Sequence, residues 1–433
     1  MDEFVVSGAF IVTNSGKNIA DGAVAIKSGR IADVGERESV LREWRGAEVI
    51  EVPGRVLMPG LINCHYHTGL TFLRGVAAAS DFEAWMDDYV APLEASLDEE
   101  ASYAAALLSC WEMVRSGTTC FADMHLNVEA VARAVEEVGI RGYLSQTIAD
   151  SYHFKGMDTL KVNELFVRRW RRKRGLVHPM FGPCAIRLTS KRLMLESAAL
   201  ANEYDSGIHT HLSENLNDVE YSLRNYGKRP THFLGECGLL GNRTIAAHGV
   251  WLDDSERALL SRTGTTVVHN PTSNAFLRSG TARVRRLLDE NVNVALGTDT
   301  AACNGNANTF AEMKQAFLSS MIQDSRETVQ PSEVFRMATL GGAKALGLDA
   351  GRIERGAQAD MVVLRPEPFM LPLEDRLWPF ENEIVLSATP SNVETVIVAG
   401  RIVLRDGRLM TTDESAIIKR FSVSAQALLA KLK

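Results

Sequence analysis

Short apolar runs alternate with longer segments of helical periodicity from residue 56 to about residue 346 of this 433-residue chain. The eight apolar runs read VLMPGLINCH, TTCFADMH, RGYLSQT, VHPMFGPC, GIHTHL, TIAAHG, TTVVHN and VNVALGTD. The segments between them, such as ASYAAALLSCWEMVRSG and NVEAVARAVEEVG, carry apolar residues at helical spacing, and several end in glycine, which favours a helix C-terminus. Eight strands that alternate with helices predict an α/β fold, a (β/α)8 TIM-like barrel.

Both ends of the chain show a different pattern, in which short strands are separated by glycine turns. The early strands lie in FVVSGAFIVT, GAVAIKSGRIADVGE and AEVIEV, and the late ones in GAQADMVVLRP and VETVIVAGRIVLRDGRL. We therefore predict one small β-sandwich domain built from residues 1–55 and 350–433, beside a barrel domain of residues 56–349.

Composition narrows the class of protein. Hydrophobic residues make up 45% and charged residues 23% of the chain, as is usual for a soluble globular enzyme. The net charge of −7 argues against nucleic-acid binding. The basic run RRWRRKR at residues 168–174 is interpreted as a solvated helix end, with an acidic partner as the alternative.

Cysteine usage and hydropathy indicate the compartment. None of the six cysteines forms a C-x-x-C pair, so no disulfide framework is predicted. No window of 18 uninterrupted apolar residues occurs, and the first residues lack the features of a signal peptide, so no membrane partner is expected. We expect a cytoplasmic protein.

Histidines cluster where the predicted barrel strands end. His65 and His67 follow the first run and point to the same side of a strand, because positions i and i+2 share a face. The further strand-end residues of this kind are His125, His209, His211, His248, His269 and Asp299. Since the C-terminal ends of barrel strands build the active site, these side chains are expected to meet in one pocket. Imidazoles with a carboxylate suit Zn²⁺ or Fe²⁺, whereas any single histidine could simply be a hydrogen-bonded core residue.

The motifs around these residues resemble those of the amidohydrolase superfamily, in its branch of mononuclear aminohydrolases. That branch includes methylthioadenosine/S-adenosylhomocysteine deaminases, guanine and cytosine deaminases, and s-triazine hydrolases. The resemblance rests on PGLINCHYH, HTHLSEN, AAHGVWLDDSE, HNPTSNAFLRSG and GTDTAACNGNANTFAEMK, and it covers nearly the whole chain.

The resemblance implies a ligand set for one divalent metal, with Zn²⁺ preferred and Fe²⁺ as the alternative. The implied ligands are His65, His67, His211 and Asp299. Binuclear relatives carry a bridging lysine at the end of the fourth strand, where this chain reads HPMFGPCAI, so a single metal is expected.

The resemblance also implies the reaction, hydrolytic deamination of an N-heterocycle that bears an exocyclic amine, such as an adenosine derivative or another purine-like ring. Glu214 matches the proton-shuttling glutamate, and His248 matches the histidine that contacts the activated water. With Asp299 they form the expected catalytic set, since general acid–base groups must give and take protons at the reacting carbon.

Several residues are candidates for substrate binding by the same resemblance. Trp85 and Glu94 match a tryptophan that covers the substrate and a glutamate that holds ribose hydroxyls, although Trp85 could equally pack on the barrel. Cys184 and Cys303 replace a histidine and a serine of the adenosine-type deaminases, which favours a different heterocycle. The remaining candidates near the pocket are His269, Asn304, His125 and His153.

Three alternatives stay open at this point. The same groups could act as an s-triazine-type hydrolase that releases chloride, an alkylamine or thiomethyl, or as a guanine, 8-oxoguanine or pterin deaminase. A non-catalytic scaffold is the third, although such relatives usually lose ligands that this chain retains. The expected partner is a small heterocyclic substrate, and a homo-oligomer is implied only by the resemblance.

Overall fold

The computed structural model describes residues 3–76, 81–150, 156–323, 328–367, 370 and 378–432. Eight parallel strands follow one another in chain order around a barrel: β6 (Leu61–Tyr66), β7 (Thr118–His125), β8 (Arg141–Ile148), β9 (Val177–Pro183), β10 (Gly207–Leu212), β11 (Thr244–His248), β12 (Thr266–His269) and β13 (Val294–Leu296). The barrel closes where the chain after β13 meets β6, since Asp299 N donates to His65 O at 3.0 Å and His67 N donates to Asp299 O at 3.2 Å. Each strand overlaps one predicted apolar run, with β6 and β8 extending one residue further, so the predicted barrel is confirmed.

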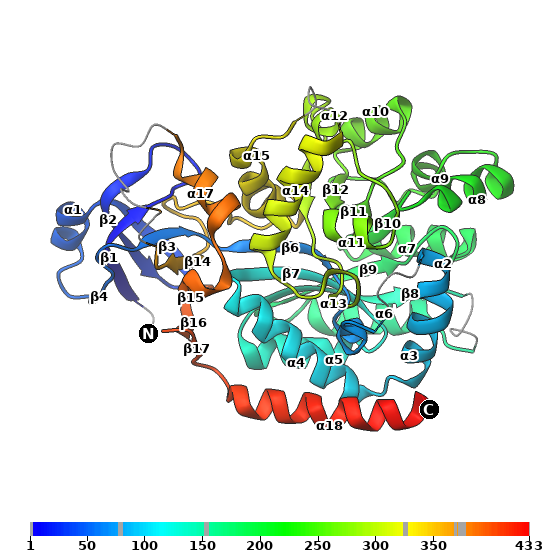
Figure 1. Cartoon of the computed structure of the whole chain (residues 1–433), viewed down its shortest axis with the longest axis horizontal. Coiled ribbons are helices and arrows are strands. Elements are labelled where there is room, and N and C mark those ends of the chain that lie inside the picture. Colours follow the sequence, from blue (N-terminus) through cyan, green and yellow to red (C-terminus); the bar gives the residue numbers. More distant parts are fainter. Residues whose placement is uncertain are drawn as a thin grey trace.

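Helices connect successive strands and surround the barrel (Figure 1). Asp98 caps the first of the long helices by accepting from Ala101 N, and Gly139, with φ +82°, ends the next one as the sequence predicts. The helices after each strand are α4 (Glu99–Arg115), α5 (Val128–Val138), α6 (Thr159–Trp170), α7 (Lys191–Glu203), α8 (Leu216–Tyr226), α9 (Pro230–Glu236), α10 (Asp254–Thr263), α11 (Pro271–Phe276), α12 (Val284–Asp289), α13 (Ala301–Asn304), α14 (Thr309–Gln323), α15 (Pro331–Arg336) and α16 (Gly342–Ala345).

The chain between β6 and α4 folds over the C-terminal end of the barrel in short helical turns. They are η1 (Thr68–Leu73), α2 (Phe82–Trp85), η2 (Met86–Val90) and α3 (Ala91–Ser96). Asp81 begins α2 by accepting from Ala84 N, and apolar side chains of these turns pack together around Trp85. This covering segment (residues 81–96) forms one wall of the site described below.

Both chain ends join in a second, mainly antiparallel sheet, as predicted. Its strands are β1 (Glu3–Ile11), β2 (Ile19–Lys27), β3 (Arg30–Glu36), β4 (Glu48–Glu51), β5 (Val56–Pro59), β14 (Met361–Leu364), β15 (Val393–Val398), β16 (Arg401–Arg405) and β17 (Arg408–Leu409). Strand β5 links the two chain ends, because it pairs in parallel with β1 and antiparallel with β14.

The apolar run at residues 56–65, which the pattern treats as one strand, is divided at Gly60. Its first part, β5, lies in the second sheet and its second part, β6, lies in the barrel. A Cβ atom at Gly60 would lie 2.2 Å from Thr119 Oγ1, so no side chain fits where the chain crosses between the sheets. The division into two domains at residues 55 and 350 stays a prediction.

Three helices of the terminal segments lie outside the sheet strands: α1 (Arg37–Glu43), α17 (Phe380–Ser387) and α18 (Glu414–Leu432). Helix α18, red in Figure 1, runs beside α4 of the barrel. Trp111 Nε1 donates to Glu414 Oε1 at 3.1 Å, and the rings of Phe72 and Phe421 stack with centroids 4.6 Å apart. The C-terminal segment therefore packs on the barrel as well as on the second sheet.

A buried ion pair joins the barrel to the second sheet. Arg141 at the start of β8 donates from Nε and Nη2 to both carboxylate oxygens of Asp360, at 3.1–3.2 Å. Asp360 Oδ1 also accepts from Ala399 N. Arg141 is 6% and Asp360 2% exposed at the side chain, so this pair has little access to water.

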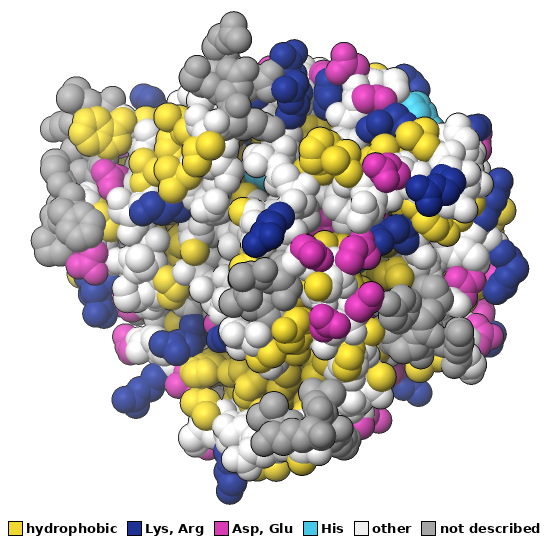
Figure 2. All heavy atoms as spheres, turned by 45° about the vertical axis from the view of Figure 1, so that its right-hand side comes forward, with side chains coloured by type: hydrophobic (Ala, Val, Ile, Leu, Met, Phe, Trp, Pro, Cys, Tyr) yellow, Lys and Arg dark blue, Asp and Glu magenta, His cyan; other side chains and the backbone are white. Residues whose placement is uncertain are grey.

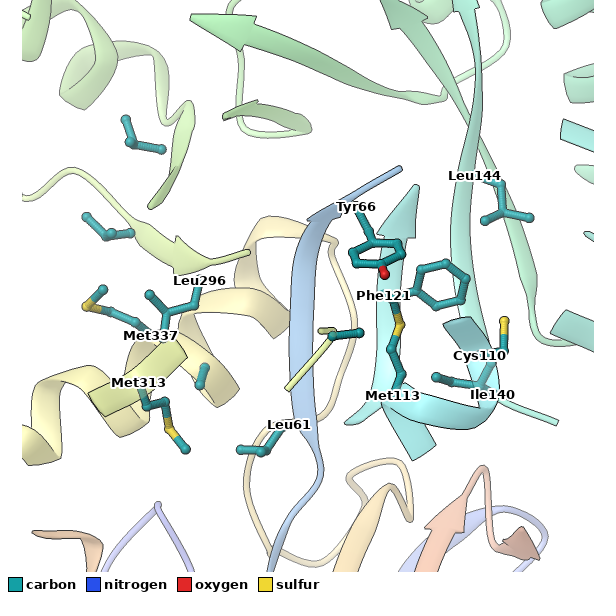
Figure 3. Close-up of a cluster of buried hydrophobic side chains, with 14 of the residues drawn as sticks. Leu61, Tyr66, Cys110, Met113, Phe121, Ile140, Leu144, Leu296, Met313 and Met337 are labelled. Carbon is teal, nitrogen blue, oxygen red and sulfur yellow. The ribbon is translucent and has the colours of Figure 1, made fainter. Parts of the chain in front are cut away.

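The apolar core lies between the barrel strands and the surrounding helices. In Figure 3, Tyr66 from β6 and Phe121 from β7 lie next to each other, with Met113 of α4 beneath them. Both rings are fully buried. Burial of a large apolar side chain stabilises a fold by roughly 1.5–3 kcal/mol, so such contacts fix the strand ends that carry the site.

Charged side chains of both signs lie on the surface. Acidic and basic side chains are interspersed over the described part of the face shown in Figure 2. In the basic run, Arg168 and Arg169 are exposed at the end of α6, and Arg169 pairs with Glu129 at 3.0 Å. Among the described residues, no helix is both long enough and apolar enough to cross a membrane.

Candidate active site at the C-terminal end of the barrel

Four predicted ligand residues converge at the end of the barrel where β6, β10 and β13 finish. His67 Nε2 lies 3.2 Å from His211 Nε2. Asp299 Oδ1 lies 3.7 Å from His65 Nε2 and 3.8 Å from His67 Nε2. The strands supply this arrangement directly, because His65 and His67 are two residues apart at the end of β6 and His211 lies near the end of β10.

Hydrogen bonds on the far side of each ring fix which nitrogen faces the centre. His67 Nδ1 donates to Met124 O at 2.9 Å, and His211 Nδ1 donates to Cys184 O at 2.8 Å. A carbonyl oxygen can only accept, so in the neutral rings each Nδ1 carries the proton and each Nε2 presents a lone pair. Burial, followed by the neighbouring imidazoles, lowers the pKa of His211 to about 3, which favours the neutral ring.

His65 completes the set of inward-facing nitrogens. Its Nδ1 lies 2.7 Å from His209 Nε2, while its Nε2 is fully buried and has no hydrogen-bond partner among the residues that the structure describes. A buried nitrogen without a partner is costly unless another group satisfies it. Three imidazole nitrogens and a carboxylate oxygen that face one another fit a divalent cation, with His209, Met124 O and Cys184 O orienting the rings from behind.

Asp299 is held as an ionised carboxylate. Burial alone would favour the neutral acid, but the imidazoles of His67 and His248 and the hydroxyl of Ser273 lower its pKa. Ser273 Oγ donates to Asp299 Oδ2 at 2.5 Å, which leaves Oδ1 directed at the histidines. Asp299 has φ +61°, an uncommon conformation for a residue other than glycine, and backbone bonds to His65 and His67 maintain it.

Glu214 and His248 face the same space from the ends of β10 and β11. Glu214 Oε2 lies 3.7 Å from His248 Nε2, and His248 Nδ1 lies 2.8 Å from Asn274 Oδ1. Burial, and then the charge of Asp299, raise the pKa of Glu214 well above its usual value. A carboxyl group with a raised pKa can hold a proton near neutral pH and transfer it, as general acid–base catalysis requires.

A pocket opens above these groups. Of the predicted substrate-binding residues, Trp85, Glu94 and Cys184 line it. Trp85 is 4% exposed and its indole Nε1 has no hydrogen-bond partner among the described residues. Apolar side chains such as Phe82 and Leu277 complete the walls, so a flat heterocycle could bind between the covering segment and the barrel.

The other candidates lie behind the pocket wall. Cys303 Sγ lies 3.2 Å from Ser273 Oγ, and Asn304 Nδ2 donates to Thr298 O and to Glu312. His269 is 1% exposed at the end of β12. The structure places none of these three among the described side chains that line the pocket.

The two remaining histidine candidates differ in how far they can be placed. His125 Nδ1 accepts from Asn127 N at 2.8 Å, which stabilises the turn after β7. His153 lies outside the described residues.

Sequence reasoning missed the residues that hold the site from outside. Ser273 and Asn274, which orient Asp299 and His248, follow β12 within HNPTSN, and their position beside a strand-end histidine was the available signal. Arg187, Asp218 and Glu83 also line the pocket, but no spacing in the sequence indicates that these three would meet.

Comparisons with known proteins identify chains and structures that are similar over nearly the full length. The chain is 40% identical to a 5'-deoxyadenosine deaminase of Methanothermobacter thermautotrophicus over 442 residues, covering 99% of each chain. It is 36% identical to a 5-methylthioadenosine/S-adenosylhomocysteine deaminase of Syntrophobacter fumaroxidans, covering 99% of this chain and 98% of the relative. The solved structure of an adenosine deaminase from Xanthomonas campestris with bound zinc matches with a TM-score of 0.92 at 28% identity, over 99% of this chain and 98% of that one.

A family profile matches most of the chain. The profile described as the amidohydrolase family matches residues 56–403, which span all eight barrel strands and the inward-facing histidines. With that match and the full-length relatives, the chain belongs to the amidohydrolase family.

Proposed function

We propose that the protein is a metal-dependent aminohydrolase that replaces the exocyclic amine of an adenosine derivative by oxygen and releases ammonia. The observation that carries the proposal is the buried pair Glu214 and His248, 3.7 Å apart, facing the four predicted ligand residues inside a pocket with apolar walls. The full-length relatives named as adenosine-type deaminases support the choice of substrate class.

His65, His67, His211 and Asp299 would hold one divalent metal. When bound, such a metal lowers the pKa of a water molecule toward neutrality and so supplies a nucleophile. We propose Zn²⁺, with Fe²⁺ as the alternative, because the ligand atoms are nitrogen and carboxylate oxygen and because the relative from Xanthomonas campestris binds zinc.

The protein side chains then move the protons. Glu214, in its protonated form, donates to the ring nitrogen beside the carbon that bears the amine, which makes that carbon electrophilic. Asp299 Oδ1, which faces the imidazoles, takes a proton from the attacking water. His248 Nε2 accepts from the attacking water and so orients it, because His248 Nδ1 donates to Asn274 Oδ1 and Nε2 of the neutral ring presents a lone pair. The proton taken up by Asp299 passes to the amine, which leaves as ammonia, and the hydroxyl proton of the adduct returns to Glu214 as the carbon becomes a carbonyl.

The wall of the pocket would select the substrate. We propose that Trp85 covers the heterocycle and that Glu94 accepts hydroxyl protons of a ribose, because both residues line the pocket on the covering segment. Cys184 lines the same pocket and presents a thiol where a stronger hydrogen-bond donor would otherwise sit. Cys303 would act through Ser273 and Asp299, which its thiol contacts at 3.2 and 3.5 Å. Asn304 would act through Glu312, and His269 through the barrel core.

Ammonia release by protein of known metal content tests the proposal. The panel contains 5'-deoxyadenosine, methylthioadenosine, S-adenosylhomocysteine and adenosine, with guanine, 8-oxoguanine, a pterin, cytosine and an aminotriazine for comparison. We expect ammonia from the adenosine derivatives, and no ammonia above background from a Glu214→Gln variant with the same metal content. Ammonia only from another ring, or release of chloride, alkylamine or thiomethyl in place of ammonia, would reject the adenosine assignment.

A cytoplasmic location and a homo-oligomer are further proposals. All six cysteines are buried and free, which suits a reducing compartment. Cell fractionation and light scattering, respectively, test them.

A further inference from the structure

One guanidinium group connects the covering segment to the main chain of Glu214. Arg187, in the loop after β9, donates from Nη1 to Glu83 Oε1 and from Nε to Asp218 Oδ1, each at 2.8 Å. Glu83 belongs to α2 of the covering segment, and Asp218 belongs to the first turn of α8. The side chain of Arg187 is 24% exposed, so water screens these bonds only in part.

Asp218 carries the connection to Glu214. Asp218 Oδ2 accepts from Glu214 N at 3.0 Å and from Asn215 N at 3.4 Å, while Asn215 Oδ1 accepts from Asp218 N. In a capping box, the side chain of the third helical residue, here Asp218, normally accepts only from the main-chain N–H of the N-cap residue, here Asn215. The additional bond to Glu214 N means that the carboxylate of Asp218 sets where the main chain of the proton-transferring residue lies.

Glu83 carries the connection to the pocket wall. Its Oε1 atom also accepts from Asn217 Nδ2 at 3.0 Å, so two donors from the barrel side hold it. The next residues of the helix include Trp85, and Arg187 lies 5.4 Å from the ring centroid of Phe82. Both aromatic residues line the pocket, so the place of this wall depends on the same guanidinium.

We propose that Arg187 is a positioning residue that holds the substrate-covering helix α2 and the main chain of Glu214 in one fixed relation, through Glu83 and Asp218. Only an arginine offers two donors in a rigid fork that can bind two carboxylates at once. The inference rests on the proposed function for its effect on turnover, whereas its geometric content is independent of that function.

Arg187→Met tests the proposal, with Arg229→Met as the matched control. Arg229 is 28% exposed and binds two carboxylates, Asp253 at 2.9 Å and Glu256 at 2.6 Å, but it does not line the substrate pocket. Any general loss from removing a paired arginine should therefore occur in both variants.

The kinetic result expected for Arg187→Met is a fall in kcat of about 10- to 100-fold at unchanged metal content, since misplacement by about 1 Å can cost about 100-fold. Glu83→Ala should mainly raise KM, by about 2- to 5-fold, as expected for loss of one partly exposed ion pair. In the Arg187→Met background, Glu83→Ala should raise KM by a smaller factor than it does in the wild type, because the two residues act through one contact. Arg229→Met should keep both constants.

Hydrogen exchange gives a readout that does not need activity. In Arg187→Met, the amides of residues 82–86 and of Glu214 and Asn215 should exchange at least about tenfold faster, and in Arg229→Met they should not. Unchanged exchange in both segments, or an equal loss of kcat in Arg229→Met, would overturn the inference. If the wild-type protein releases no ammonia from adenosine derivatives, the proposed function fails, and the exchange rates still decide whether Arg187 joins the two segments.

Discussion

The Nε2 atoms of His67 and His211 lie 3.2 Å apart, while the Nδ1 atom of each ring donates to a main-chain carbonyl. Two neutral rings in this arrangement direct lone pairs at each other, which is unfavourable without a cation between them. The end of β7 and the residue after β9 supply the two carbonyls, Met124 O and Cys184 O, so the fold itself selects the tautomers. The rings of the proposed metal ligands are thus oriented by main-chain contacts.

Asp299→Ala should lose bound metal and activity together. The substitution removes the carboxylate that faces His65 and His67 and leaves three imidazoles, which weakens the metal site. Metal analysis of the purified variant, together with ammonia release, checks this. Asp21→Ala, at an exposed site in the second sheet, is the control and should keep both. An Asp299→Ala protein that retains one metal per chain would remove Asp299 from the ligand set.

Glu214→Gln should keep the metal and lose turnover by about 10²–10⁴-fold, because glutamine can accept a hydrogen bond but cannot transfer the proton. The variant keeps the shape of the pocket and its contact with His248, so binding of substrate should change little. Glu220→Gln, on an exposed position of the adjoining helix α8, provides the comparison. A Glu214→Gln rate within about tenfold of the wild-type rate would assign the proton transfer to another group.

The positions of the barrel strands and of the predicted ligands follow from local sequence. Period-2 geometry places His65 with His67, and the parallel barrel brings strand ends together, so spacing alone brings these residues to one place. Local sequence contains no comparable rule for Cys303 and Asn304, because α13 turns Cys303 toward Ser273 and Asp299 and Asn304 toward Glu312, and neither lines the pocket. The sequence also did not predict the division of the strand at Gly60, because the requirement for glycine there comes from contact with Thr119, which is distant in sequence.

Contacts between loops are the other part that sequence could not predict. Arg187 meets Glu83 only because the covering segment and the loop after β9 approach each other across the barrel end. Their separation of 104 residues carries no periodic signal. Such ion pairs are consequences of the tertiary fold.

Glu312 should make stability depend on pH. Burial raises its pKa to about 7, although Thr272 and Asn304 donate to its carboxylate. The folded state then binds more protons than the unfolded chain between about pH 4.5 and pH 7. The contribution of Glu312 to the free energy of unfolding is therefore full below pH 4.5 and is lost as the pH rises through 7.

Urea unfolding at pH 5, 6, 7 and 8 measures this dependence. A shift of this size corresponds to at most about 3 kcal/mol. The free energy of unfolding of Glu312→Gln should change less with pH than that of the wild type. Because both proteins share the proposed metal site, the difference between their two curves of free energy against pH isolates Glu312. Parallel curves would show that the carboxyl does not titrate in this range.

The buried pair of Arg141 and Asp360 gives the last prediction. Arg141→Met leaves the Asp360 carboxylate buried without its cation, so the free energy of unfolding should fall by about 3–5 kcal/mol. The loss should come mainly from the unpaired charge and not from the missing attraction, since desolvation offsets much of the Coulomb energy of a buried pair.

A second substitution separates these two causes. Arg141→Met with Asp360→Asn removes the charge but keeps an oxygen that can accept from Ala399 N. The double variant should therefore recover most of the lost stability in urea unfolding, with kcat unchanged, because both residues lie between the barrel and the second sheet, outside the described residues that line the substrate pocket. A double variant as unstable as Arg141→Met would mean that the attraction between the two groups, and not the cost of an unpaired charge, holds the barrel to the sheet.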